Sequence, residues 1–276
     1  MTYATILVHA EADPAGEPRL KLAAGLAGQF KATLIGIAAE LYEPTAFGSE
    51  YVNVDGELLV AEAKAIADDL KMARDRFQAA CSAVSVETQW RSGPAMPAEA
   101  VALEARAADL IVVGPHGKSS PGFHSRPDPG DLVMRSGRPV LVTPPGLDKL
   151  DASSIVVAWR DSREARRAVA DAMPLLRLAN QVLIVEICEA RAAAAMQDGL
   201  TDMAEYLGRH GVKASTAVRD PGKATVAEAL IEVADMQEAG LVVAGAYGHA
   251  RLREWMFGGV TRELLAGCHR AVLLSH

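Results

Sequence analysis

Short apolar runs alternate with longer stretches of helical periodicity along the chain. In the second half, runs rich in β-branched residues predict strands at 154–159, 181–187, 213–218, 240–245 and 271–275. Apolar residues between these runs recur at helical spacing and predict helices at 164–178, 196–210, 226–237 and 262–266. Because apolar strands that alternate with helices form a parallel sheet covered on both faces, the pattern predicts a doubly wound α/β fold.

The first half repeats this pattern with related residues. The segment Ala108–Gly114 returns as Ala239–Gly245, a shift of 131 residues (239 − 108). The opening strand Thr5–Val8 returns as Ser154–Val157, a shift of 149 residues (154 − 5). The larger shift at the start implies an insertion in the first half, which we place around Glu40 to Leu59.

The segment Pro144-Pro145-Gly146 separates the two copies, because two prolines and a glycine stop a strand and oppose a helix. We therefore predict two domains, 1–146 and 150–276, each built on a five-stranded parallel sheet. Strands at 139–143 and 271–275 are expected to pair across a two-fold axis. Such pairing makes the chain an internal pseudo-dimer or, between two chains, a homodimer.

Composition argues against several classes of protein. The 276 residues carry a formal net charge of −7, whereas nucleic-acid-binding proteins are usually basic. Cys81, Cys188 and Cys268 lie far apart, so we expect neither a disulfide framework nor a metal site. We also expect no signal peptide, and no apolar run approaches the roughly 20 residues of a membrane span. The sequence favours a cytoplasmic protein without membrane contact.

One loop near the C-terminus indicates a binding site. The apolar run at 241–244 leads into Gly245 and Gly248, and nine residues later the chain reads Gly258-Gly259-Val260-Thr261. Glycines at the end of a strand let the backbone turn and present N–H groups to an anion. A helix start just beyond adds the positive end of its dipole, so the loop predicts a phosphate site.

The internal repeat, the alternating elements and this glycine loop together resemble the universal stress protein family in its tandem, two-domain form. The resemblance covers nearly the whole chain and implies the doubly wound fold of that family, many of whose members bind ATP. Members that bind it use a G-x2-G-x9-G-(S/T) loop and an acidic residue after the first strand. Carried over position by position, the resemblance implies a nucleotide site formed by Ala158, Arg160, Asp161, Ile187, Ala244, Gly245, Gly248, His249, Arg251, Gly258, Gly259, Val260 and Thr261.

Two of these positions depart from the family pattern. Gly259 replaces the usual serine, and Arg160 stands where the acidic residue falls. Asp161 follows directly, and we favour a helix N-cap there, with Glu164 completing a capping box, over a ribose contact. Other roles stay open: Arg251 and His249 either neutralise phosphate or are solvated, and the strand-end residues Ala158 and Ile187 line the adenine pocket only by resemblance.

The first half departs in another way. Gly114 and Gly117 keep the opening of the loop, and Glu11 retains a carboxylate at the acidic position. Pro127 and Pro129, however, stand on the far side, where proline offers no N–H donor. This half is therefore expected to be degenerate as a nucleotide site. The aromatic-rich insertion at 42–51 is either a lid over its cleft or an anchored loop, and we favour the loop.

The sequence thus favours a regulatory, stress-response protein with one adenine nucleotide, ATP or AMP, in the second domain, with or without Mg²⁺. Bound nucleotide would alter a surface that a protein partner, not identified by the sequence, recognises. A module that has lost its nucleotide and acts only through protein contacts is the alternative. A slow ATPase or nucleotidyl transferase is the less favoured enzymatic one, since we assign no catalytic residue.

Overall fold

The computed structural model describes residues 2–42, 56–115, 123–246 and 259–276. The first half contains β1 (Thr5–His9), α1 (Glu17–Phe30), β2 (Thr33–Tyr42), α2 (Gly56–Cys81), β3 (Thr88–Pro94), α3 (Pro97–Glu104), β4 (Leu110–Val113), β5 (Phe123–His124), α4 (Pro129–Ser136) and β6 (Val140–Val142). The second half contains β7 (Ser154–Ala158), α5 (Arg163–Leu176), β8 (Gln181–Ile187), α6 (Ala193–Arg209), β9 (Ala214–Arg219), α7 (Val226–Met236), β10 (Leu241–Gly245), α8 (Gly259–Gly267) and β11 (Ala271–Ser275). None of the described helices is both long and apolar enough to cross a membrane.

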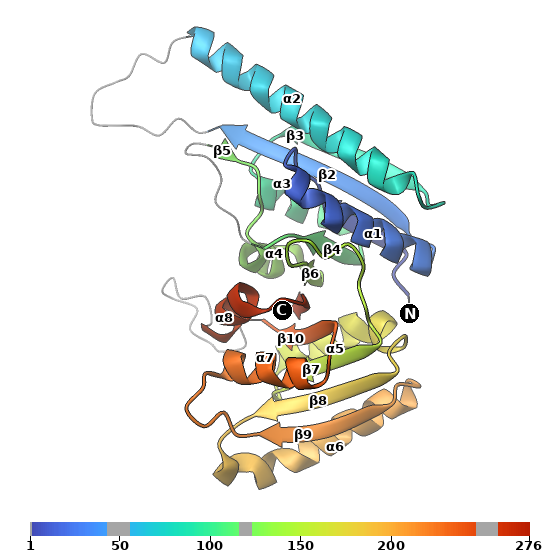
Figure 1. The fold of residues 1–276 in the computed structure, drawn as a ribbon, viewed down its shortest axis with the longest axis vertical. Helices are drawn as coiled ribbons and strands as arrows, with labels where there is room; N and C mark the ends of the chain where they lie inside the picture. Colours follow the sequence, from blue (N-terminus) through green and yellow to red (C-terminus); the bar gives the residue numbers. More distant parts are fainter. Residues whose placement is uncertain (1, 43–55, 116–122, 247–258) are drawn as a thin grey trace, which may run out of the picture.

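The strands of both halves join in one sheet, which runs along the long axis of the molecule (Figure 1). Their order is β3-β2-β1-β4-β6-β11-β10-β7-β8-β9, and the short strand β5 pairs with the end of β2. Along this path the neighbours are parallel within each half. The predicted doubly wound α/β fold is confirmed.

The two halves meet along a seam in the middle of the sheet. Strands β6 and β11 pair antiparallel there, with Leu141 opposite Leu273. This is the pairing that the sequence predicted, and it forms within one chain. The Tyr3 hydroxyl adds a second link by donating a hydrogen bond to the Asp171 carbonyl at 2.7 Å. The domain limits 1–146 and 150–276, and any association of two chains, stay predictions.

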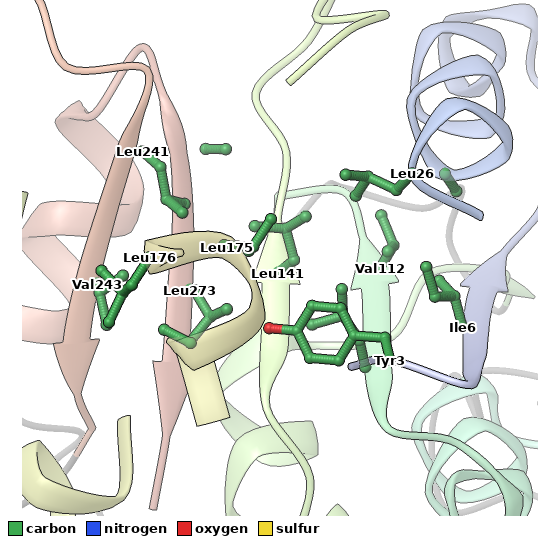
Figure 2. Close-up of a cluster of buried hydrophobic side chains, with 14 of the residues drawn as sticks. Tyr3, Ile6, Leu26, Val112, Leu141, Leu175, Leu176, Leu241, Val243 and Leu273 are labelled. Carbon is green, nitrogen blue, oxygen red and sulfur yellow. The ribbon is translucent and has the colours of Figure 1, made fainter. Parts of the chain in front are cut away.

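Helices cover both faces of the sheet. Helices α1, α2, α5 and α6 pack on one face, in a buried cluster that includes Ile6, Leu141 and Leu273. Helices α3, α4, α7 and α8 pack on the other, where the buried cluster includes Leu7 and Val140. Neighbouring residues of one strand enter opposite clusters because side chains alternate along a strand. Figure 2 shows that the first cluster is continuous across the seam, with side chains from both halves.

The strands of the second half begin and end within one residue of their predicted limits, whereas three helix starts differ. Helix α6 begins at Ala193, three residues before its predicted start at 196. The N-cap of α5 is Ser162, whose hydroxyl accepts from the Ala165 N–H at 3.2 Å. The predicted cap at Asp161 is therefore wrong by one residue, and Asp161 instead pairs with Arg166. Helix α8 begins at Gly259, three residues before the predicted start, so its first turn contains the end of the glycine motif.

The insertion in the first half lengthens regular elements. Strand β2 has 10 residues and α2 has 26, whereas their counterparts β8 and α6 have 7 and 17. The last two residues of β2, Leu41 and Tyr42, extend beyond the part that pairs with β3 and form an antiparallel ladder with β5. Residues 43–55 lie outside the described residues, so the choice between a lid and an anchored loop stays open for them.

Candidate functional site

Each half of the sheet contains a point at which the strand order reverses. The chain leaves β1 towards β2 and β3 on one side and returns to β4 on the other, and β7 and β10 have the same relation. In open parallel sheets, ligands bind beyond the carboxyl ends of the strands at such a switch point. The chain therefore has two candidate places for a ligand: the first-half switch point between β1 and β4, and the second-half switch point between β7 and β10.

The predicted nucleotide residues surround the second-half switch point. Ala158 ends β7 and lies directly beside Ala244 of β10, which Gly245 follows. Arg160 and Asp161 lie two and three residues beyond Ala158, and Ile187 ends the neighbouring strand β8. Gly248, His249, Arg251 and Gly258 lie outside the described residues, so their roles stay predictions.

Gly245 has a packing role that the sequence did not predict. A Cβ at this position would lie 2.6 Å from the Ala165 nitrogen and 2.7 Å from the Glu164 carbonyl carbon, both backbone atoms of α5. Only glycine lets the start of α5 approach the end of β10 this closely. The next N–H group, that of Ala246, donates to the Ser275 carbonyl at 2.8 Å. The end of β10 is therefore explained by packing and sheet pairing without any ligand.

The first turn of α8 offers donors for an anion. Gly259, Val260 and Thr261 are its first three residues, and the N–H groups of a first helical turn have no partner within the helix. Val260 is exposed and Thr261 is buried. Among the described atoms, the one closest to a Cβ built on Gly259 is Glu263 Oε1, at 3.8 Å. These atoms therefore leave room for a ligand beside this turn. This turn has the geometry and dipole of a phosphate-binding helix start.

The charges around the second-half switch point include residues that the sequence reasoning missed. Arg160 is exposed, and Glu186 near the end of β8 is buried, with its pKa raised by burial and partly lowered again by Arg160. His276 contacts the Ala246 carbonyl at 3.0 Å and Arg163 at 3.3 Å. Arg163 belongs to a basic helix face in the sequence, and only the fold shows that it also lies at this edge.

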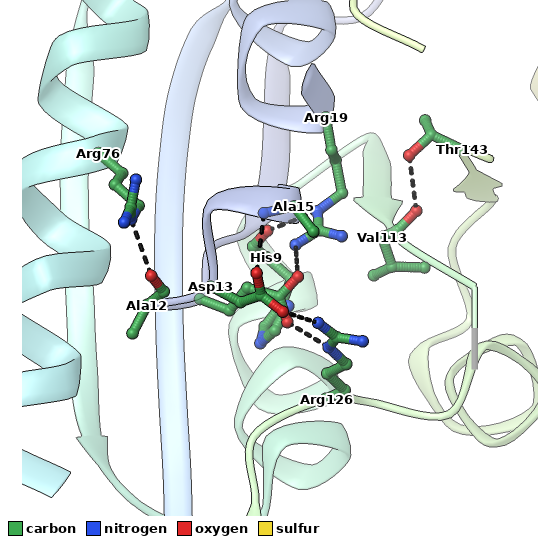
Figure 3. A network of polar contacts seen from close by, with 10 residues as sticks. His9, Ala12, Asp13, Ala15, Arg19, Arg76, Val113, Arg126 and Thr143 are labelled. Atoms are coloured by element: carbon green, nitrogen blue, oxygen red, sulfur yellow. Dashed lines mark hydrogen bonds and ion pairs between the residues drawn. The ribbon is translucent and has the colours of Figure 1, made fainter. Parts of the chain in front are cut away.

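The first-half switch point is filled by its own side chains (Figure 3). Arg19 of α1 donates from Nε to the His9 carbonyl at 2.9 Å and from Nη2 to Glu11 Oε1 at 3.1 Å. Arg126 donates from Nε to Glu11 Oε2 at 2.5 Å and from Nη2 to Asp13 Oδ2 at 2.8 Å. Both oxygens of Glu11 are engaged, so the carboxylate that the sequence placed at the acidic position already has two arginine partners.

The helix that follows the first-half loop is closed to anions. The Asp128 carboxylate caps α4 by accepting from the Asp131 N–H at 2.9 Å, and Pro129 occupies the first turn. Asp131 adds a second acidic side chain in that turn, and acidic groups there already complement the helix dipole. A phosphate would meet carboxylates at this helix start, which supports the prediction of a degenerate first half.

A small cavity remains at the first-half switch point. Its volume is about 70 Å³, and its walls include Glu11, Arg19, Gly114, Arg126 and Thr143. Pockets that hold drug-sized or cofactor ligands measure about 300–1,000 Å³, so an adenine nucleotide does not fit there.

His9 is another buried polar residue that lines this cavity. Its Nε2 atom has no hydrogen-bond partner among the described residues. The pKa of His9 is far below its ordinary value because the ring is buried and faces the guanidinium groups of Arg19 and Arg126. This histidine therefore stays neutral at physiological pH and adds no charge to the switch point.

No group of three His, Cys, Asp or Glu side chains within the described ranges is arranged to hold a metal ion. The three cysteines are free thiols.

The sheet order and the two switch points define a doubly wound α/β protein. Within that class, the chain belongs to the universal stress protein family, because the model of that family matches residues 2–144. The match covers the first half of the chain, and the strands of the second half have the same order as those of the first.

Solved structures show the same fold over the whole chain. A universal stress protein from Archaeoglobus fulgidus DSM 4304 aligns with 98% of this chain and 95% of its own, with a TM-score of 0.66 and 16% identity. A putative universal stress protein from Pseudomonas aeruginosa UCBPP-PA14 aligns over 99% and 93%, with a TM-score of 0.58 and 15% identity. A functionally unknown protein from Pseudomonas aeruginosa PAO1 aligns over 99% and 92%, with a TM-score of 0.56 and 16% identity. A search of curated proteins gives no match.

Proposed function

We propose that this protein is a regulatory, stress-response protein that binds an adenine nucleotide, ATP or AMP, at its second-half switch point. The observation that carries the proposal is the difference between the two helix starts at the sheet edge. Helix α8 begins with Gly259, Val260 and Thr261 and has no acidic residue in its first turn, whereas α4 is capped by Asp128. Of the two starts, that of α8 is the one suited to phosphate.

The residues present fit a nucleotide in part. The N–H groups of the first α8 turn would receive the phosphates, and Ala158 and Ile187 at the ends of β7 and β8 offer apolar, half-buried surface for a base. Arg160, exposed at the same edge, would add positive charge. When the nucleotide is ATP, Mg²⁺ would accompany its phosphates rather than a site in the protein. A cytoplasmic location, expected from the sequence, belongs to this proposal.

Regulation fits the site better than turnover. At the second-half switch point, Asp161 is paired with Arg166 and Glu164 with Arg163, and we assign no general base there. Binding would change the surface at the carboxyl edge of the sheet, which a partner protein would then recognise.

The substitution Gly259→Asp tests the proposal. Mass spectrometry of denatured protein, purified from cells, should detect close to one ATP, ADP or AMP per wild-type chain. The variant should release at least ten times less, because a carboxylate in the first α8 turn repels phosphate. The same carboxylate complements the helix dipole, and a Cβ on Gly259 meets no described atom closer than 3.8 Å, so the variant should stay folded.

Gly259→Asn is the matched control, since asparagine has nearly the same size and no charge. It should keep most of the nucleotide. Equal nucleotide content in Gly259→Asp and Gly259→Asn would contradict a phosphate site at α8. A wild-type protein that carries no nucleotide would favour the protein-interaction module, which Arg160 at the acidic position also favours. Nucleotide consumption that is abolished by His249→Ala would favour an enzyme.

A further inference from the structure

A short segment of the first half, residues 123–128, is held to the sheet edge by its first two residues and by Arg126. We call this segment the latch. Its first two residues form β5 and pair with Tyr42 and Leu41 of β2. The Ser125 backbone lies near the buried His9 ring and opposes the lowering of its pKa. Arg126 then bridges Glu11 and Asp13. These contacts join the latch to β2, to β1 and to the loop after β1.

The guanidinium of Arg19, which we call the plug, fills the space beneath the latch. A Cβ on Gly114, just after the end of β4, would lie 2.3 Å from Arg19 Nη1, so the plug rests directly on this backbone. The Arg19 side chain is 8% exposed and its partner Glu11 is 6% exposed. Burial lowers the pKa of Arg19 and Glu11 opposes that shift. A buried charge of this kind is stable only with its partner in place.

The latch and the plug share one residue. Glu11 accepts from Arg19 with one oxygen and from Arg126 with the other. Removal of either arginine leaves Glu11 with one partner, and removal of Glu11 leaves a buried guanidinium without its counter-charge. Such three-membered networks behave as a unit, because the loss of one member weakens the contacts of the others.

We propose that the first-half switch point is held shut by its own chain, with Arg19 as a built-in occupant and residues 123–128 as the latch over it. The end of the enlarged β2 serves as the docking edge for the latch. In this way the first half is complete without a ligand, and the chain keeps one permanently closed switch point. This inference concerns only the first half and holds whether or not the second half binds nucleotide.

The second half lacks the corresponding parts. Under the shift of 149 residues that relates the opening strands, Ala158 stands in the place of His9 and Arg160 in the place of Glu11. Helices α1 and α5 start 146 residues apart (163 − 17), which places Ala165 at the position of Arg19. Strand β8 ends at Ile187 and has no extension comparable to Leu41 and Tyr42. The closing network is thus a property of one copy of the repeat.

Hydrogen exchange of Arg126→Leu tests the latch. Leucine keeps the apolar stem of the side chain and removes both ion pairs. The amides of residues 123–126 should exchange at least ten times faster than in the wild-type protein, while the amides of β7 and β10 keep their rates. Arg135→Leu is the control, because it removes an exposed ion pair with Asp131 on the neighbouring helix α4. Unchanged exchange at 123–126 in Arg126→Leu overturns the proposal.

Gly114→Ala tests the plug in the same assay. The added methyl group must displace the end of Arg19, so it should also accelerate exchange at 123–126. Gly93→Ala is the control, since a Cβ there meets no atom within 4 Å. Faster exchange in Gly114→Ala supports coupling of plug and latch through Glu11. If Arg126→Leu opens the latch and Gly114→Ala leaves it unchanged, Arg19 is not part of the closing device.

Discussion

At the scale of single residues, glycine occurs in the predicted phosphate motif for two different reasons. Gly245 is required because the α5 backbone lies against it, whereas a Cβ on Gly259 at the start of α8 meets no described atom closer than 3.8 Å. The spacing of glycines in the sequence predicts a close approach at both positions. The glycine spacing does not distinguish an approach by the protein's own backbone from an approach by a ligand, because both require a residue without a Cβ.

Gly245→Ala should therefore lower stability. The new methyl group overlaps the Glu164 and Ala165 backbone, which has no flexible end that can move away. We expect a loss of about 2 kcal/mol in the free energy of unfolding, measured by urea denaturation. Gly199→Ala is the control, because a Cβ in that part of α6 meets nothing within 4 Å and alanine favours a helix. Equal stability of Gly245→Ala and wild type would refute the packing role.

The network of Glu11, Arg19 and Arg126 also belongs to this scale, and the sequence does not predict it. Glu11 and Arg126 are separated by 115 positions, and no local pattern links residues at that distance. The prolines at 127 and 129 do predict that the first-half loop is a poor phosphate site. They act through a property of the residue itself, the missing N–H, which needs no knowledge of the fold.

At the scale of elements, the strands and helices of the second half agree with the sequence because hydrophobic periodicity is a local property. The start of α8 was predicted too late, since Gly259, Val260 and Thr261 all have low helix propensity. The cap of α5 was misplaced because Asp161 and Ser162 are both good N-cap residues in adjacent positions. Strand β5 has two residues and no hydrophobic alternation, so its pairing with β2 appears only in the structure.

Glu40 of β2 predicts a pH dependence for the packing of β2 against α2. Burial, together with the nearby Asp69 of α2, raises the pKa of Glu40 to about 7. The folded state therefore holds this proton more tightly than the unfolded state. Stability contributed by the protonated form is complete below pH 4.5 and is lost as the pH rises through about 7.

Glu40→Gln should remove this dependence and raise the melting temperature at pH 8, while it changes little at pH 4. Thermal unfolding followed across pH 4 to 8 provides the measurement. Glu205→Gln, which affects an exposed ion pair on α6, should leave the profile unchanged. A Glu40→Gln profile parallel to that of the wild type would mean that Glu40 does not titrate between these values.

At the scale of the whole molecule, the antiparallel seam between β6 and β11 makes one sheet from two parallel ones. The internal repeat predicts this seam because each copy ends in an apolar strand that would otherwise be an exposed edge. The side chains that meet there, such as Leu141 and Leu273, are fully buried and belong to one core cluster with α1 and α5. The two halves are therefore expected to unfold together.

Leu141→Ala tests this coupling. The substitution removes a fully buried side chain opposite Leu273 and should cost about 3 kcal/mol. Urea unfolding should remain a single transition when followed by Trp90 in the first half and Trp159 in the second, using variants that retain one of these tryptophans. Leu103→Ala, at an exposed position on α3, should cost well under 1 kcal/mol. Two separated transitions in the wild type would show that the seam does not couple the halves.

The seam has one more consequence. Because β6 and β11 lie on the same polypeptide, their association does not depend on protein concentration, and dilution in the cell cannot separate them. Two identical chains that meet along such an edge must have identical switch points. Two halves of one chain have no such symmetry requirement, so one switch point can be closed while the other stays open. Each chain then carries one closed switch point in its first half and one switch point without that closure in its second half.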